Sequence, residues 1–276
     1  TNTIPNWSAA FGVGASALTG GLKLWPIELF VNSDRQGVAH INENTFELST
    51  VEGTSLTIAR EMGLGTLKVI WAKRKTDWDD NLDLDGGPFP IANTSRFTNY
   101  SAETLEVQLS GSTDKMEYVV GYYALKDDAY TSNPQSYFGG GRLFNQNYSV
   151  SSEAEAFFGQ ITWSFAENWD LTLGARTTEE DKDGYKEFVG IFSQAGQGSF
   201  DDTSGTFIIS HDYSENTNLY FKLADGFKAG GINGEAPTPI EALQPYESEK
   251  IESTEFGLKG RYFDNRMMLN LSLIHI

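Results

Sequence analysis

The chain contains no cysteine among its 276 residues. Disulfide frameworks and thiolate metal sites are therefore excluded. The absence is also compatible with a compartment in which thiols would be oxidised.

Long apolar runs are missing as well. No stretch approaches the roughly 18 to 20 consecutive apolar residues that a membrane-spanning helix needs, and the mean hydropathy is negative. A transmembrane strand needs only about 9 to 11 residues, of which every second one is apolar. The sequence thus argues against spanning helices and leaves spanning strands open.

Signals for catalysis are also lacking. The histidines His40, His211 and His275 lie far apart, and none belongs to an H-E-x-x-H pattern. There is no G-x-S-x-G elbow, no P-loop and no G-x-G-x-x-G that opens a helix. The run Gly139–Gly141 is interpreted as a flexible loop, because no helix follows it to hold a phosphate. We therefore expect no catalytic residue, no metal site and no cofactor, and a protein that is not an enzyme.

Basic residues are scarce relative to acidic ones. The chain has 20 Lys and Arg against 38 Asp and Glu, a formal net charge of −18. This balance argues against nucleic acid or anionic lipid as a partner. The excess of acid is explained either by solvated loops and a wet lumen or by a vestibule that attracts cations.

Apolar residues recur at every second position in many segments, which is the period of a strand whose two faces differ. In Leu219–Ala224 the apolar residues carry odd numbers and Lys222 an even one. The expected strands are Thr54–Glu61, Gly65–Trp78, Thr104–Ser110, Met116–Tyr122, Phe157–Phe165, Trp169–Arg176, Thr203–Tyr213, Thr217–Lys228, Lys250–Phe263 and Arg266–Leu273. A turn at Ala17–Gly21 and short strands at Leu22–Leu24 and Ile27–Val31 are expected before them. The later segments make about ten strands in five hairpins.

The connections between these strands alternate between short turns and long loops. Long loops are expected at Asp79–Pro90, Lys126–Val150, Glu179–Asp202 and Gly226–Pro245. Outer-membrane barrels have short turns at one rim and long loops at the other, with apolar residues toward lipid and polar residues toward the lumen. A soluble sandwich also alternates, but its strands are usually about five or six residues long. The pattern favours an all-β fold of the transmembrane antiparallel β-barrel type over a soluble all-β domain. It also predicts water on the face that carries Arg176.

Aromatic residues gather beside the short turns. They are Trp163, Phe165, Trp169, Tyr213, Tyr220, Tyr262 and Phe263. Rings with a polar edge suit the headgroup level of a membrane, so these residues are interpreted as an interfacial girdle. The alternative is that they are ordinary core aromatics that cap turns.

Two acidic runs match the first half of a calcium-binding loop, which has oxygen ligands at alternate positions followed by glycine and a closing glutamate. The first run contains Asn81, Asp83, Asp85 and Gly86, and the second contains Glu179, Asp181, Asp183 and Gly184. Ala92 and Gly190 stand where the closing glutamate is required. A weak extracellular calcium site and a solvated acidic loop both remain open for each run.

A third set of residues could contact a ligand. Aromatic rings with one arginine form a platform for a flat molecule that is rich in oxygen or anionic. The candidates, all expected in one long loop, are Tyr137, Phe138, Arg142, Phe144 and Tyr148.

Two runs near the end of the chain carry a family resemblance. These are "LYFKLADGFKAGGIN" and "LQPYESEKIESTEFGLKGRYFDNRMMLNLSL". They resemble the late barrel strands of TonB-dependent outer-membrane receptors, where a "GFK-small-GG-apolar-N" turn precedes an extracellular loop and a "P-E…E-G-K…LN" pair of strands follows. The resemblance extends, less sharply, over about residues 51 to 273, through runs such as "ETLEVQLSG" and "AFFGQITWSFAENWDLTLGARTTEEDKDG".

The resemblance implies a fold and a function. Such receptors have barrels of about 22 strands around a plug, lie in the outer membrane of Gram-negative bacteria and bind a scarce ligand, commonly a ferric siderophore. They import it with energy from the TonB complex of the inner membrane. Residues 51–276 would then be a partial barrel that lacks the plug and the C-terminal strands, and residues 1–50 a poorly matched segment before it. We expect contact with outer-membrane lipid, with the ligand, and with TonB through the missing plug.

Two alternatives stay open. The chain could be a small self-contained outer-membrane porin or adhesin, which requires the first and last strands to pair. It could also be a soluble carbohydrate-binding β-sandwich, which requires two packed sheets and no belt of residues that face lipid.

Overall fold

The computed structural model describes residues 41–236 and 238–276. The turn and the two short strands expected between Ala17 and Val31 lie outside this range. Within it the regular structure consists of β-strands. Among these residues, no helix is long and apolar enough to cross a membrane.

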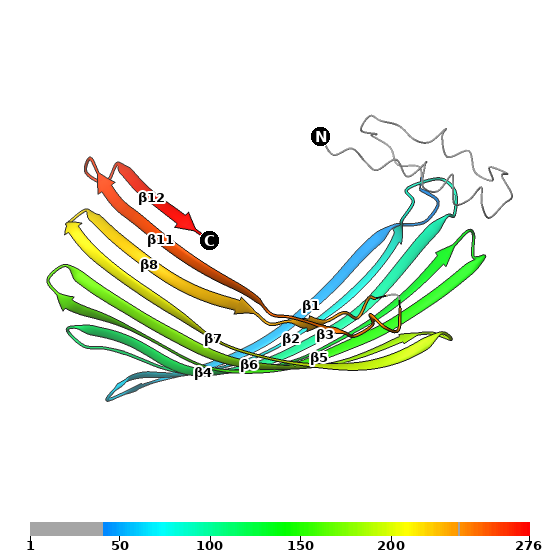
Figure 1. Cartoon of the computed structure of the whole chain (residues 1–276), viewed down its shortest axis with the longest axis horizontal. Helices are drawn as coiled ribbons and strands as arrows, with labels where there is room; N and C mark the ends of the chain where they lie inside the picture. The colour runs from blue at the N-terminus through cyan, green and yellow to red at the C-terminus, as the bar shows by residue number, and fades with distance from the viewer. Residues whose placement is uncertain (1–40, 237) are drawn as a thin grey trace. The chain divides into compact units, whose positions relative to one another are not determined.

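Ten strands form one sheet, and they follow one another in sequence order from β1 to β8 and then β11 and β12 (Figure 1). The strands β9 and β10 make a separate two-stranded sheet. The bounds are β1 Phe46–Met62, β2 Gly65–Asp83, β3 Ala92–Ser112, β4 Met116–Tyr137, β5 Arg142–Ala166, β6 Trp169–Phe188, β7 Phe192–Ser214, β8 Thr217–Lys228, β9 Gly231–Ile232, β10 Pro245–Tyr246, β11 Glu249–Tyr262 and β12 Met267–His275.

The ten expected strands are all present, as the neighbouring strands of a single sheet. Its edges are β1 and β12, which are not neighbours in the described residues. The pairing of first and last strands that a self-contained barrel requires is therefore not found there. Nor do the described residues show two large sheets packed face to face.

The prediction of long loops is wrong for two of the four segments. The strands β4 and β5 extend through Lys126–Val150 and leave only residues 138–141 as a turn, while β6 and β7 extend through Glu179–Asp202. In the latter hairpin the pairing runs without interruption from Trp169↔His211 to Phe188↔Phe192. The Gly, Ser and Asp content of these segments suggested loops, but continuous ladder hydrogen bonds satisfy the backbone and hold them extended.

The described residues fall into two compact units. One combines the described part of Thr1–Ser49 with Trp78–Thr98 and Ser132–Gln146. The other, here called the strand unit, combines Thr50–Asp77, Asn99–Thr131 and Asn147–Ile276. The first is here called the polar-network unit, after the hydrogen bonds given below.

Short turns at one end of the strand unit are closed by residues that tolerate a left-handed backbone. Asn168 has φ 61° between β5 and β6. Asp264 and Asn265 have φ 55° and 64° between β11 and β12. Asn and Asp adopt this conformation more readily than most residues, because their short polar side chains bond locally. The expected turns at these positions are confirmed.

Candidate functional site

The strand unit has one apolar and one polar face. On β5 the apolar face carries Phe157, Ile161, Trp163 and Phe165, all of which are exposed. The residues Leu171, Leu173, Phe221 and Leu258 lie on the same kind of face, and none of them is buried. The apolar side chains therefore do not form a closed interior, which is the arrangement expected if they face lipid.

The polar face carries hydrogen-bonding side chains from the alternate positions. Thr162 and Thr172 are 2.9 Å apart at their hydroxyl oxygens, and Ser164 donates to Asp170 over 2.6 Å. Gly174 and Gly184 also lie on this face of β6 and carry no side chain.

Arg176 lies on the polar face, as expected. Its guanidinium carbon is 5.4 Å from the ring centre of Tyr123 and 5.9 Å from that of Phe158. Its Nε donates to the hydroxyl of Thr178 over 3.1 Å. The two rings stabilise the cation through their π faces, so the arginine is held within the sheet face without an ion pair to it among the described residues.

The turn aromatics form a chain of ring contacts across β5, β6 and β7. Ring centres are 5.9 Å apart for Trp163 and Phe165, 6.3 Å for Phe165 and Trp169, and 4.3 Å for Trp169 and His211, which stack. Trp163, Phe165 and Trp169 are all exposed. Exposure favours the girdle over the core interpretation for these three.

Tyr220 does not belong to this girdle. Its hydroxyl donates to Glu255 over 2.5 Å, and the ammonium of Lys259 lies 5.2 Å from its ring centre. Tyr220 therefore lies on the polar face. The expectation failed because proximity to a turn does not fix the side on which a strand residue points.

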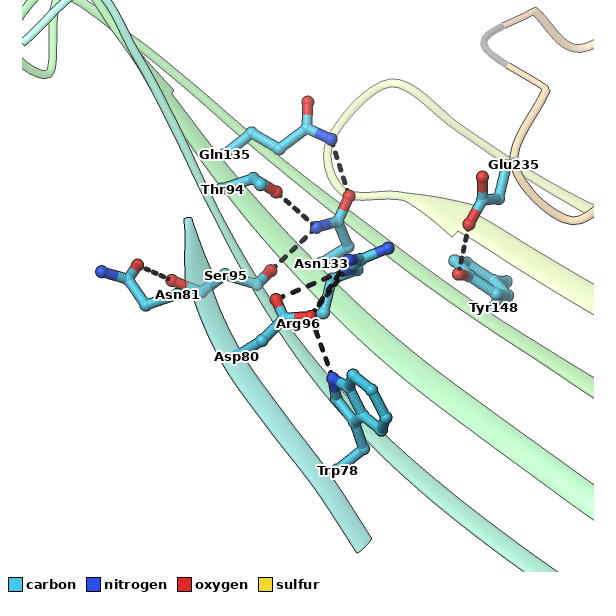
Figure 2. A network of polar contacts seen from close by, with 10 residues as sticks. All are labelled: Trp78, Asp80, Asn81, Thr94, Ser95, Arg96, Asn133, Gln135, Tyr148 and Glu235. Atoms are coloured by element: carbon cyan, nitrogen blue, oxygen red, sulfur yellow. Dashed lines mark hydrogen bonds and ion pairs between the residues drawn. The ribbon is translucent and has the colours of Figure 1, made fainter. Parts of the chain in front are cut away.

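A buried carboxylate organises the polar-network unit (Figure 2). Asp80 is 1% exposed and forms a 3.0 Å ion pair with Arg96. The indole Nε1 of Trp78 donates to the same carboxylate over 3.0 Å. These charged and indole donors satisfy a carboxylate that burial would otherwise penalise strongly.

A second part of this network joins β3 to β4. The amide nitrogen of Asn133 donates to the hydroxyl of Thr94 over 2.7 Å and to the backbone carbonyl of Ser95 over 2.8 Å (Figure 2). Asn133 also accepts from Gln135 over 2.6 Å. The network fixes the strand ends from which the connection Leu84–Ile91 departs.

The first acidic run shapes a turn. Asp83 accepts from the backbone nitrogens of Asp85 and Gly86, and Asp85 accepts from those of Gly87 and Ala92, over 2.9 to 3.1 Å. Burial, together with the nearby Asp83 carboxylate, raises the pKa of Asp85 against the effect of these hydrogen bonds. These hydrogen bonds use part of the acceptor capacity of both carboxylates to hold the turn.

The second acidic run is not a loop. Glu179, Asp181 and Asp183 lie in β6 at alternate positions, so they share one face and their α-carbons are about 6.6 Å apart from one to the next. Asp183 accepts a 2.9 Å hydrogen bond from Gln197. Among residues 41–236 and 238–276, no group of three or more His, Cys, Asp or Glu side chains is arranged to hold a metal ion.

The structure separates the expected ligand platform. Tyr137, Arg142 and Phe144 lie in strands and only Phe138 lies in a turn, all in the polar-network unit. The rings of Tyr137 and Phe144 meet edge to face with centres 5.8 Å apart, whereas Phe138 and Arg142 are exposed. Tyr148 lies in the strand unit. The loop placement was therefore wrong for four of the five, while a role in binding stays a prediction.

The expected long loop Gly226–Pro245 contains β9 and the start of β10 and lies on the polar face of the strand unit, a contact that the sequence did not predict. The connection from β8 to β11, Gly230–Ser248 without Pro237, is here called the strap. Lys182 and Lys186 of β6 each donate a 2.8 Å hydrogen bond to it, at the carbonyls of Gly230 and Gly234. The available signal was a lysine on both sides of Gly184 at alternate positions, but the pattern does not show what the lysines touch.

A family model described as TonB dependent receptor-like, beta-barrel, matches residues 5–276. None of the curated proteins that were compared has a matching sequence.

Several solved structures share the fold. The ferric yersiniabactin uptake receptor FyuA from Yersinia pestis is 15% identical with a TM-score of 0.74, and the match covers 85% of this chain and 37% of that one. The siderophore receptor PiuA from Acinetobacter baumannii is 13% identical with a TM-score of 0.66, over 88% and 42%. The ferric citrate transporter FecA in its unliganded form is 15% identical with a TM-score of 0.60, over 83% and 34%. At these identities the likeness concerns the fold, and this chain spans less than half the length of each.

Proposed function

Because the chain belongs to the TonB-dependent receptor β-barrel family, we propose that it is part of an outer-membrane receptor that binds a ferric siderophore and imports it. The energy would come from the TonB complex of the inner membrane. The transport is binding followed by gated translocation and includes no covalent catalysis. The observation that carries the proposal is the family match, together with a sheet whose apolar face is exposed.

The two faces support a location in the outer membrane of a Gram-negative bacterium. Exposed Phe, Leu and Trp side chains on one face suit hydrocarbon and headgroups. Arg176, Lys182 and hydroxyl groups on the other suit an aqueous lumen. Lipid on one side and water on the other are what a barrel strand requires.

The ligand is proposed from two lines of support. FyuA and PiuA are named as receptors for ferric yersiniabactin and for a siderophore. In this chain, Tyr137 and Phe144 form an aromatic pair in the polar-network unit, and the same unit contains exposed Phe138 and Arg142. We propose these four as ligand contacts, because rings and one guanidinium suit an anionic, oxygen-rich chelate. Tyr148, which belongs to the strand unit, is proposed separately as a ligand contact.

Uptake of radiolabelled ferric siderophores by cells that express the complete receptor tests the proposal. We expect saturable uptake that is lost when a protonophore collapses the proton-motive force or when TonB is deleted. Uptake that persists without TonB would indicate a porin instead. Absence of uptake for every ferric chelate tested, with the receptor present in the outer membrane, would contradict the siderophore assignment.

A further inference from the structure

The hairpin of β6 and β7 extends beyond the strand that pairs with its other side. β7 pairs with β6 along the whole of β6, whereas its pairing with β8 ends at Thr206↔Ala224. Just beyond that point the backbone nitrogen of Gly205 donates to the carboxylate of Asp225 over 3.0 Å instead of to a backbone carbonyl. Figure 1 shows the hairpin continuing past the end of β8. One edge of β7 is therefore left without a neighbouring strand in the described part of the sheet.

The backbone groups along this edge belong to every second residue. Residues of an antiparallel strand direct their N–H and C=O groups alternately to one neighbour and to the other. Because Gly205 donates away from β6, the odd-numbered residues before it point the same way. Five of them, all exposed, are here called the open edge: Ser193, Ala195, Gln197, Ser199 and Asp201. Among residues 41–236 and 238–276 no backbone hydrogen bond reaches them from that side. Each offers one donor and one acceptor.

The sequence of the open edge does not protect it against pairing. Sheet edges are usually protected by proline, by charged residues, by bulges or by short strands. From Phe192 to Phe200 the strand contains neither proline nor a charged residue, and its register with β6 has no shift. The edge lies beyond the apolar positions of β6, which end at Ala175 opposite Gly205, so it is outside the hydrocarbon, where an open edge would not be tolerated. The edge is therefore available to another extended chain.

The surface beside the open edge is acidic. Glu179, Asp181 and Asp183 continue the apolar side of β6 beyond Ala175, and Asp201 of β7 is the register partner of Glu179. These four exposed carboxylates, here called the acidic patch, form no ion pair with another described residue. At the border of the patch, the ammonium group of Lys250 in β11 forms an ion pair with Asp202. A basic side chain is thus already held beside this edge.

We propose that the open edge binds an extended basic segment of a partner protein, which adds to β7 as a further strand. A second copy of the hairpin is disfavoured as the occupant, because it would bring two acidic patches together. A basic segment gains both the backbone hydrogen bonds of strand addition and charge complementarity. This binding goes beyond the proposed import and does not depend on the siderophore.

The geometry of an antiparallel pair fixes how such a segment lies. Residues directly opposite each other share one face and direct their backbone groups to each other. Basic residues at alternate positions, opposite the residues of the open edge, would therefore lie on the side of the acidic patch. The N–H groups of these same basic residues would donate to the open edge, whereas those of the residues between them would point to water.

Peptides of defined backbone chemistry test the proposal on the complete receptor, purified in detergent. The probe is a fluorescent peptide in which Lys and Thr alternate, and the anisotropy of its fluorescence measures binding. N-methylation of the Lys backbone nitrogens removes the donors that face the open edge, so it should weaken binding roughly tenfold or more. N-methylation of the Thr nitrogens keeps the same charge and should change the affinity little. A peptide in which Glu replaces Lys should not bind.

Receptor variants test the edge and the acidic patch separately. Ala195→Pro removes one donor of the open edge and leaves the β6 ladder intact, because the N–H of Ala195 points away from β6; we expect roughly tenfold weaker binding. Ala195→Val keeps the donor and is the matched control. Asp181→Asn combined with Asp183→Asn should weaken binding and reduce its dependence on salt. Glu215→Gln, at an exposed acid in the short turn between β7 and β8, should change neither.

Failure of the complete receptor to bind the peptide of Lys and Thr would overturn the proposal. So would equal binding of the two methylated peptides, since charge alone would then explain the affinity. Receptor dimers that cross-link through Ala195→Cys, in place of peptide binding, would assign the edge to a second copy and overturn it as well. The peptide comparisons use unaltered receptor, so a folding defect of Ala195→Pro cannot produce their result. Anisotropy reports binding whether or not a siderophore is imported.

Discussion

The ammonium of Lys186 donates a 2.8 Å hydrogen bond to the backbone carbonyl of Gly234, and the lysine is fully buried. Moving an ammonium group out of water is costly. Burial accordingly lowers the pKa of Lys186, and the nearby carboxylate of Glu235 opposes this effect without reversing it. Lys186 lies near the end of β6 opposite the short turn, beyond the roughly 9 to 11 residues that cross the hydrocarbon.

We predict that docking of the strap strengthens as the pH rises from the lowered pKa of Lys186 toward its ordinary value of 10.5. In this window the undocked state binds more protons than the docked state, so docking is favoured by raising the pH. Below the window the full cost of burying the ammonium is present. In a doubly labelled parent with nitroxides at Ile240→Cys in the strap and Val189→Cys in the turn between β6 and β7, the distances should narrow as the pH rises toward 10.5, and Lys186→Met should lose this response. A parent whose distances broaden over this range would contradict the sign.

We predict that Arg96→Met destabilises the protein by about 1 to 3 kcal/mol, because it leaves the carboxylate of Asp80 buried without its ion pair. Urea unfolding in detergent measures the change. Lys126→Met is the control, since Lys126 and Glu153 are both exposed and the loss of their ion pair should not be measurable. Equal effects of the two variants would refute the role given to the Asp80 network.

We predict that Trp163 and Trp169 lie at the level of the lipid headgroups. In single-tryptophan variants, their fluorescence should be quenched most by lipids brominated near the top of the acyl chain. Trp78 serves as the control, because its indole is bonded to buried Asp80 and should not respond to brominated lipid. Quenching of Trp163 equal to that of Trp78 would contradict the assignment of Trp163 to an interfacial girdle.

We predict that Arg142→Ala weakens binding of an anionic ferric chelate by roughly tenfold or more, as expected for loss of a charged contact of about 1.5 to 3 kcal/mol. Titration of the receptor with the chelate measures this. Arg266→Ala, at an exposed arginine in the short turn between β11 and β12, is the control. Unchanged affinity in Arg142→Ala and in Tyr148→Ala would exclude the platform.

The alternation of residues identified the strands and their faces. Leu171 and Leu173 fall on the side opposite Arg176, because the period of two follows from strand geometry alone. The lengths of the strands were harder to predict from the sequence. Gly184 and Gly196 suggested a loop, yet they pair with each other four positions before the hairpin ends at Phe188 and Phe192. Local composition does not reveal the partner strand that completes the hydrogen bonds.

The candidate site was harder to predict than the fold. Tyr137 and Phe144 were predicted only as members of a ligand platform, and a tight turn at residues 138–141 brings their rings together, while their role in binding stays a prediction. The strap contacts could not be foreseen, since Lys186 and Gly234 are 48 residues apart and meet only in the folded chain. Leu243 was an unremarkable apolar residue in the sequence. Its contact with Gly184 and Gly196 exists only because β6 and β7 pair in register.

A barrel strand requires lipid at one face of the sheet and water at the other. A nitroxide scan of β6 from Leu171 to Arg176 in outer membranes measures this directly. Each position would be compared for its collisions with oxygen, which concentrates in hydrocarbon, and with a water-soluble nickel chelate. We predict that Leu171, Leu173 and Ala175 collide more with oxygen and that Thr172, Gly174 and Arg176 collide relatively more with the chelate, in strict alternation. Equal ratios along the strand, or protection of Leu171 and Leu173 from both reagents, would contradict the barrel.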